Sequence, residues 1–107
     1  MARVHVCSVT ELPSGESLRV DTQPAVALFH VGEDFYAVAD LCTHATASIS
    51  EGYLDDHDST VECPIHTARF CLKTGAALCQ PATEPLQTFP VVVEDGEIYL
   101  DMPEEAA

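Results

Sequence analysis

Two short stretches of this chain decide its fold: Cys42-Thr43-His44 and Cys63-Pro64-Ile65-His66. Each offers one thiolate and one imidazole at short spacing, and eighteen residues separate His44 from Cys63. Two cysteines and two histidines can close a tetrahedral zinc site, or they can divide two and two over the irons of a [2Fe–2S] cluster. The candidate ligands are therefore Cys42, His44, Cys63 and His66, and the residue types alone leave both kinds of site open.

The two motifs together are more informative than either motif alone. With five Cys and five His among 107 residues, chance produces Cys-x-His about 0.2 times and Cys-x-x-His about as often, so each is a weak signal by itself. Finding both in this order, at a loop-sized separation and with Thr43 and Pro64 inside them, is several-fold rarer. The sequence therefore predicts a metal or cluster site built from two loops.

Composition indicates one globular domain with a strongly negative surface. A chain of 107 residues, 47% of them hydrophobic, can bury about 60–65% of its unfolded surface around one core. Four basic and eighteen acidic residues give a net charge of −14, which repels nucleic acid and anionic lipid. The same charge would steer the protein toward a basic patch on a protein partner, or it serves solubility alone.

The sequence also predicts where the protein works. No apolar run approaches the length of a membrane span, and the first five residues lack a signal-peptide core, so we expect a cytoplasmic protein with no membrane association. We take a monomer as the default. Beyond the two cysteines among the candidate ligands there are Cys7, Cys71 and Cys79. In a reducing compartment these are expected to be free thiols that pack as small buried hydrophobic side chains.

Short apolar and alternating runs predict an all-β fold of antiparallel sheets. Residues 25–31 are a continuous apolar run that Gly32-Glu33-Asp34 turns into residues 35–39, which predicts a hairpin. Residues 90–101 alternate on both sides of Asp95-Gly96 and predict a second hairpin. Further expected features are strands at 3–8, 18–20, 60–62 and 69–72, a helical turn near 48–50, and a glycine turn at Gly75.

The residues around the ligands resemble those of Rieske iron–sulfur proteins, because Cys-Thr-His opens the first loop and Thr67-Ala68-Arg69-Phe70 follows Cys-Pro-x-His in the second. This resemblance implies a Rieske fold, with a small cluster-binding subdomain at about residues 41–82 inserted in a base β-domain, all within a single domain 1–107. It also implies that Cys42 and Cys63 hold one iron, and that His44 and His66 hold the other. Two neutral imidazoles in place of thiolates leave the oxidised cluster less negative, so it accepts an electron more readily than an all-cysteine cluster.

Within that superfamily, the chain looks like the stand-alone ferredoxin of multicomponent aromatic-ring-hydroxylating dioxygenases. The resemblance covers most of the chain, including residues 50–54 between the loops and 69–75 after the second loop. Such ferredoxins take single electrons from a flavin reductase and pass them to the Rieske centre of the terminal oxygenase. The expected function is therefore that of an electron carrier with these two partners. No nucleophile with an adjacent base is evident, so we expect no independent catalysis.

Two other functions compete with this expectation. The small Rieske-type subunit of an assimilatory nitrite reductase is similar in size and would carry the same cluster, and fold alone does not choose between partners. A structural zinc module suits two Cys and two His, although zinc sites seldom combine Cys-x-His with Cys-Pro-x-His. The other histidines and the acidic stretch 55–58 are expected to be hydrogen-bonded or solvated rather than functional; the histidines are His5, His30 and His57.

Two positions depart from the family pattern. Ala45 follows the first histidine, and Ala68 lies two residues after the second, where glycine is usual. If either backbone requires a positive φ, alanine costs stability there. The ligand set itself is unaffected.

We expect a midpoint potential at the low end of the Rieske span of about −150 to +300 mV. High-potential members carry a disulfide beside the cluster and hydroxyl donors to sulfur, whereas this chain has Ala47 and Ile65, and Ala68 and Phe70, at the corresponding positions. Without those donors the added electron is stabilised less. A redox titration measures the midpoint, and a clearly positive value would contradict this expectation. A visible spectrum tests the zinc alternative, because a Rieske protein is coloured and a zinc protein is colourless.

Overall fold

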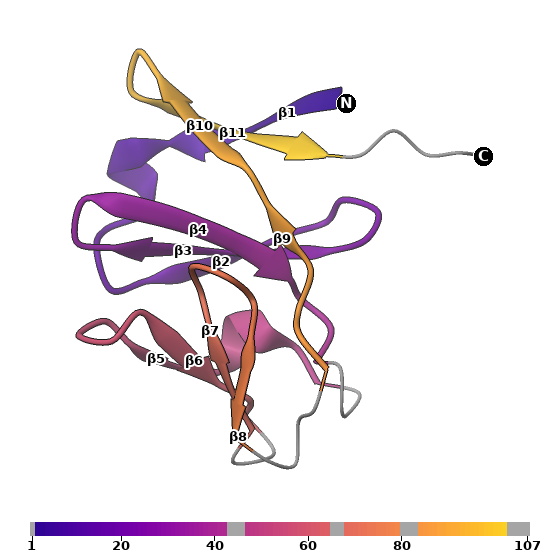
Figure 1. Ribbon diagram of the computed structural model, residues 1–107. Coiled ribbons are helices and arrows are strands. Elements are labelled where there is room, and N and C mark those ends of the chain that lie inside the picture. The colour runs from indigo at the N-terminus through magenta and orange to yellow at the C-terminus, as the bar shows by residue number, and fades with distance from the viewer. Residues whose placement is uncertain (1, 43–46, 65–67, 80–83, 103–107) are drawn as a thin grey trace.

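The computed structural model describes residues 2–42, 47–64, 68–79 and 84–102, which form three antiparallel sheets (Figure 1). The first sheet has the order β1 (Ala2–Ser8), β11 (Glu97–Met102), β10 (Val91–Glu94). The second has the order β2 (Ser17–Val20), β3 (Val26–Val31), β4 (Asp34–Ala39), β9 (Thr88–Phe89). The third has the order β5 (Tyr53–Asp55), β6 (Thr60–Glu62), β7 (Arg69–Cys71), β8 (Ala77–Cys79).

The helical content of these residues is small. It consists of two single-turn 3₁₀ helices, η1 (Val9–Glu11) and η2 (Ile49–Glu51), and no helix in the described ranges is long and apolar enough to span a membrane. The predicted all-β class of antiparallel sheets is confirmed, as is the predicted helical turn near residue 49.

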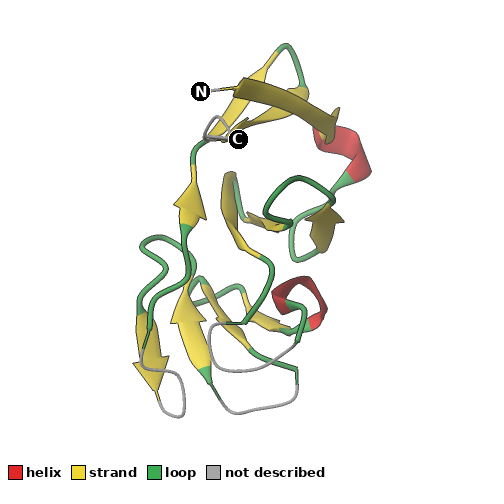
Figure 2. Ribbon diagram, turned by 90° about the vertical axis from the view of Figure 1, so that its right-hand side faces the viewer, coloured by secondary structure: helices red, strands yellow, loops and turns green. Residues whose placement is uncertain are grey.

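The three sheets lie in layers, with the second sheet in the middle (Figures 1 and 2). Side chains alternate along a strand, so Val26 and Leu28 of β3 pack in the core shared with the first sheet, and Ala27 and Phe29 pack in the core shared with the third. All four are 0% exposed. Burial on both faces explains why residues 25–31 are apolar without alternation.

The core between the second and third sheets reaches the candidate ligands. It contains the two largest fully buried side chains, Phe29 from β3 and Phe70 from β7. Cys42 and Cys63 belong to the same cluster of buried residues. The cysteine half of the predicted site is therefore an extension of a packed core.

The third sheet is formed entirely by chain that lies between β4 and β9, and these two strands are neighbours. Ala37 pairs with Phe89 and Val38 with Thr88, and the Ala39 amide donates to the Gln87 carbonyl at 2.8 Å. The chain thus leaves the second sheet and returns to the adjacent strand. This topology is that of an insertion into a base of β strands, as expected for the fold class.

The predicted hairpins are present as β3–β4 and β10–β11. The second has Asp95 at φ 52° and Gly96 at φ 77°, the two left-handed positions that a type I′ turn requires. The sequence did not predict β5, β8 or β9. These strands are three, three and two residues long, so their runs carry little alternation. β5 and β8 pair with their neighbours in sequence, β6 and β7, whereas β9 pairs with the distant strand β4.

Gly75 lies in the turn between β7 and β8 and is hydrogen-bonded to the segment that leads back to β9. It has the predicted positive φ, +80°, after β7. Its amide donates to the Cys71 carbonyl, and its carbonyl accepts from the Leu86 amide, both at 2.7 Å. A Cβ on Gly75 would lie 2.1 Å from the Leu86 carbonyl oxygen, so the backbone there leaves no room for a side chain.

We expect Gly75→Ala to lower the free energy of unfolding by about 3 kcal/mol or more, because left-handed strain and a backbone clash add. Gly96→Ala is the matched control: its φ is +77°, and a Cβ there meets nothing within 4 Å, so strain alone should cost about 1–2 kcal/mol. Urea unfolding measures both. Equal destabilisation of the two variants would contradict the clash.

Candidate metal centre

The first candidate loop begins directly after β4. Cys42 is 3% exposed, and its amide donates to the Ala47 carbonyl at 3.0 Å. Leu41 and Ser48 form a single antiparallel bridge just outside that hydrogen bond. The chain therefore enters and leaves this loop through one closed neck.

The second loop has the same kind of neck. Cys63 is 0% exposed, and its amide donates to the Ala68 carbonyl at 2.8 Å. Outside it, β6 and β7 are paired with Glu62 opposite Arg69, and Arg69 Nη2 lies 3.3 Å from Glu62 Oε1. In both loops a cysteine amide bonds the carbonyl five residues later, so each motif starts from the same local closure.

The structure describes two of the four predicted ligands. Cys42 and Cys63 are both buried and share one core cluster with Ala68 and Phe70. The predicted ligands His44 and His66 lie outside the described residues. Within those residues, no three or more His, Cys, Asp or Glu side chains are grouped to hold a metal ion.

The surroundings of the two cysteines fit an iron–sulfur group. Apolar burial disfavours a charged thiolate, and a bound metal removes that penalty because coordination neutralises the charge. Two thiols carried by two closed loops into one apolar cluster therefore suit a shared group with soft, sulfur-preferring metals. They provide half of the four-ligand set that the sequence predicts.

Ala68, one of the two departures from the family pattern, carries no left-handed strain. Among the described residues, Ser59 and Asp95 are the non-glycine residues with a positive φ. Ala68 is 0% exposed, and its methyl group belongs to the core cluster. Alanine is thus accommodated at this position, whereas Ala45 lies outside the described residues.

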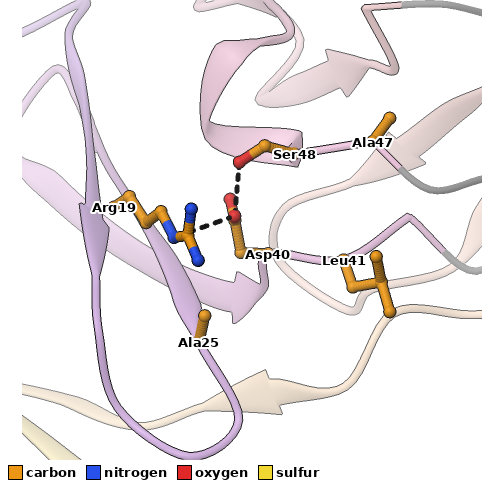
Figure 3. Close-up of a pocket in the computed structure, with 6 residues that line it drawn as sticks. All are labelled: Arg19, Ala25, Asp40, Leu41, Ala47 and Ser48. Atoms are coloured by element: carbon orange, nitrogen blue, oxygen red, sulfur yellow. Dashed lines mark hydrogen bonds and ion pairs between the residues drawn. The ribbon is translucent and has the colours of Figure 1, made fainter.

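The role of Asp40 was not predicted from the sequence. This residue is 4% exposed, and it accepts hydrogen bonds from Ser48 Oγ and, at 2.8 Å, from the Ser50 amide. Arg19 Nε lies 3.6 Å from its Oδ2. Asp40, Ser48 and Arg19 line an open pocket of about 230 Å³ beside the first loop (Figure 3). The only sequence signal was an acidic residue between an apolar strand and a ligand motif.

The remaining histidines have ordinary partners, as expected. His30 Nδ1 lies 2.6 Å from the Leu12 carbonyl oxygen, and its ring stacks on Phe35 at 4.1 Å. His5 Nε2 lies 2.6 Å from a carboxylate oxygen of Glu97. The exposed His57 is hydrogen-bonded to Asp58, which raises its pKa.

The cysteines outside the motifs differ from one another. Cys7 and Cys71 are free thiols, and the side chain of Cys79 lies outside the described part. Cys7 is buried as expected, and burial raises its pKa. The expectation of burial is wrong for Cys71, which is half-buried. A hydrogen bond from the Thr74 side chain lowers the pKa of Cys71.

A known family, known relatives and solved structures are similar to this chain over most of its length. A family model described as the Rieske [2Fe–2S] domain matches residues 2–90. The 3-phenylpropionate/cinnamic acid dioxygenase ferredoxin subunits of Shigella flexneri serotype 5b and Escherichia coli K12 are 61% identical over 104 residues, 97% of each chain. One solved chain, from a complex of reduced oxygenase and oxidised ferredoxin in carbazole 1,9a-dioxygenase, is 39% identical with a TM-score of 0.86, covering 92% of this chain and 91% of that one. A solved protein described as a candidate NADPH nitrite reductase small subunit is 27% identical with a TM-score of 0.80, covering 95% and 100% of the two chains.

The pKa values of the two free thiols predict different reactivities, because the thiolate is the nucleophile. At neutral pH we expect iodoacetamide to modify Cys71 faster than Cys7. Thr74→Val removes the hydroxyl donor and should slow modification of Cys71, by about tenfold for each unit that its pKa rises, while Thr74→Ser should preserve the rate. Peptide mass spectrometry after timed alkylation measures both sites. Equal rates at Cys71 in all three proteins would contradict the role of Thr74.

Proposed function

The chain belongs to the Rieske [2Fe–2S] domain family, and from this premise we propose that it carries single electrons from a flavin reductase to the Rieske centre of a terminal aromatic-ring dioxygenase. The observation that carries the proposal is the 61% identity to dioxygenase ferredoxin subunits over 97% of the chain. The proposal includes a cytoplasmic monomer without independent catalysis. The free thiols Cys7 and Cys71 are compatible with a reducing compartment.

We infer that Cys42 and Cys63 bind one iron of the cluster, and that His44 and His66 bind the other. The closed necks support this assignment, since each presents its cysteine at the same point of a loop. When bound, the cluster accepts and releases one electron. Ala68 and Phe70 are both fully buried; they exclude water from the cysteine side and offer no hydroxyl to stabilise added negative charge, which supports the low potential.

We also propose that residues 41–82 form the cluster-binding subdomain within a single domain 1–107. Two features support these limits. The third sheet lies wholly inside them, and β4 and β9, which flank them, pair with each other. Both candidate loops then belong to one unit.

Surface charge supports a partner with a basic docking face. Three of the four basic residues are already paired with carboxylates: Arg3 with Glu94 and Asp101, Arg19 with Asp21 and Asp40, and Arg69 with Glu62. The net charge of −14 therefore leaves a large excess of acidic groups. Such a surface speeds encounter with a positive surface and slows encounter with a negative one.

The alternative client, a nitrite reductase, has weaker support. The candidate nitrite reductase small subunit shares 27% identity with this chain, against 61% for the dioxygenase ferredoxin subunits. Both would use the same cluster, so the partner assay decides between them. A zinc module has no support from the family to which the chain belongs.

The direct experiment is anaerobic purification from cells supplied with iron and sulfide, followed by metal and sulfide analysis. We expect about two irons and two labile sulfides per chain, and electron transfer from a flavin reductase to an aromatic-ring oxygenase. A purified protein with neither iron nor labile sulfide would refute the carrier function. Transfer to a nitrite reductase catalytic subunit, without transfer to an oxygenase, would favour the alternative.

His44→Cys and His66→Cys should each lower the midpoint potential of the loaded protein, because an added thiolate makes the cluster more negative. The shift should be on the order of 100 mV, given that Rieske centres begin near −150 mV and four-cysteine centres lie near −400 mV. His57→Gln, at an exposed histidine, is the control and should leave the potential unchanged. A cluster-loaded ligand variant with an unaltered midpoint would refute the assignment.

A further inference from the structure

Asp40 holds the chain on both sides of the first ligand loop. Its amide donates to the Ala25 carbonyl at 2.9 Å, and its carbonyl accepts from the Ile49 amide at 2.6 Å. Its carboxylate accepts from Ser48 Oγ through Oδ2 and from the Ser50 amide through Oδ1, the latter at 2.8 Å. Asp40, which lies before the loop, therefore bonds three consecutive residues after the loop and also Ala25, the residue that precedes β3.

Arg19 connects the Asp40 carboxylate to β2. Its Nε lies 3.6 Å from Asp40 Oδ2 and 3.2 Å from Asp21 Oδ1, and Figure 3 shows the guanidinium and Ser48 reaching the Asp40 carboxylate from different elements. The Asp40 side chain is 5% exposed, against 86% for Asp21. A carboxylate so buried is stable only with its charge and lone pairs satisfied, so these contacts act together. Ser17 Oγ adds a second link from β2, donating to the Ser50 carbonyl at 2.7 Å.

The second ligand loop is held differently in the part of the chain that the structure describes. It connects β6 and β7, which pair over three residues up to Glu62 and Arg69. The first loop has the single Leu41–Ser48 bridge among the described residues. The Asp40 hydrogen bonds thus supply to the first loop the fixation that a strand pair supplies to the second.

We propose that Asp40 is the positioning residue of the first ligand loop, with Ser48 and Ser50 as its contacts on the loop exit and Arg19 as its link to the base sheet. It acts on Cys42 through the neck and not by touching the cluster. The ligand role of Cys42 rests on the proposed function, but the role of Asp40 in holding the neck does not.

The first test uses hydrogen exchange and needs no cluster. Asp40→Ala removes the carboxylate acceptor of Ser48 Oγ and of the Ser50 amide, but it keeps the backbone acceptors of the Cys42 and Ile49 amides. Because the neck should open more often without the carboxylate, the amides of Cys42, Ile49 and Ser50 should all exchange about tenfold faster, while the Cys63 amide should keep its wild-type rate. Asp21→Asn is the matched control, because it removes an exposed partner of Arg19 and should change neither loop. Equal acceleration of both loops would indicate a general structural role and overturn the proposal, as would no acceleration at the first loop.

The second test uses the cluster-loaded protein. Changing an outer-shell partner of a metal site typically costs about 10- to 100-fold in metal affinity, so Asp40→Ala should lose its visible absorbance to a chelator about tenfold faster and show an altered electron paramagnetic resonance spectrum when reduced. Asp40→Asn keeps an oxygen for the Ser50 amide and should recover part of the difference. Ser48→Ala should shift both readouts in the same direction by less.

The outcomes separate this proposal from the proposed function. A wild-type protein without iron and sulfide refutes the electron carrier but leaves the exchange test of Asp40 intact. A loaded wild-type protein whose Asp40→Asn and Ser48→Ala variants match it in spectrum, chelator sensitivity and exchange refutes the positioning role. Those two milder variants decide the matter should Asp40→Ala fail to fold.

Discussion

Burial of both faces of β3 is the constraint on which the rest of the structure depends. Leu28 and Phe29 are adjacent in sequence, point to opposite sides and are both 0% exposed. Full burial of side chains of this size stabilises a fold by about 1.5–3 kcal/mol each, and here it joins three layers through one strand. The core on the Phe29 side includes Cys42 and Cys63, so the sulfur donors are carried by the most tightly packed part of the chain.

The two ligand loops show how one local closure can have two kinds of support. Both begin with a cysteine amide bonded to the carbonyl five residues on. The second loop is held by adjacent strands of one sheet, whereas the first begins after β4, ends before η2 and is held by a buried carboxylate. A redox site benefits from rigid loops, because a small change of geometry on electron transfer means a small reorganisation of its surroundings. Different means of fixation can meet this requirement equally well.

Local sequence signals predicted much of the fold. At the site they predicted Cys42 and Cys63 but not the contacts of Asp40. Asp95-Gly96 between alternating residues predicted its hairpin because turn type and strand pattern are both local properties. The strands β5, β8 and β9 are two or three residues long, so they carry too little alternation for a local pattern to indicate them, and β9 pairs with the distant strand β4. The residues around Cys42 and Cys63 predicted the family. The structure buries both cysteines in one core cluster.

Other parts of the site were beyond sequence reasoning for physical reasons. Asp40 has the partners Arg19, Ser48 and Ser50, and no spacing rule connects these positions. From sequence alone, a single acidic residue is expected to be exposed on the surface. Cys71 was expected to be buried, yet it follows the buried Phe70 in β7, and neighbouring residues in a strand face opposite ways. The roles of His44 and His66 and the low potential stay predictions.

The pairing of β4 with β9 has a consequence for how such proteins can diversify. Since the chain departs and re-enters through neighbouring strands, the intervening segment resembles a cassette with two adjacent attachment points. Recombination at those points would exchange the segment with the third sheet and both ligand loops between relatives, while the first and second sheets keep their own register. A segment exchanged in this way has to meet two requirements. Its apolar side chains must pack against the face of β3 that bears Ala27 and Phe29, and the residue at its start must pair with Arg19 on β2.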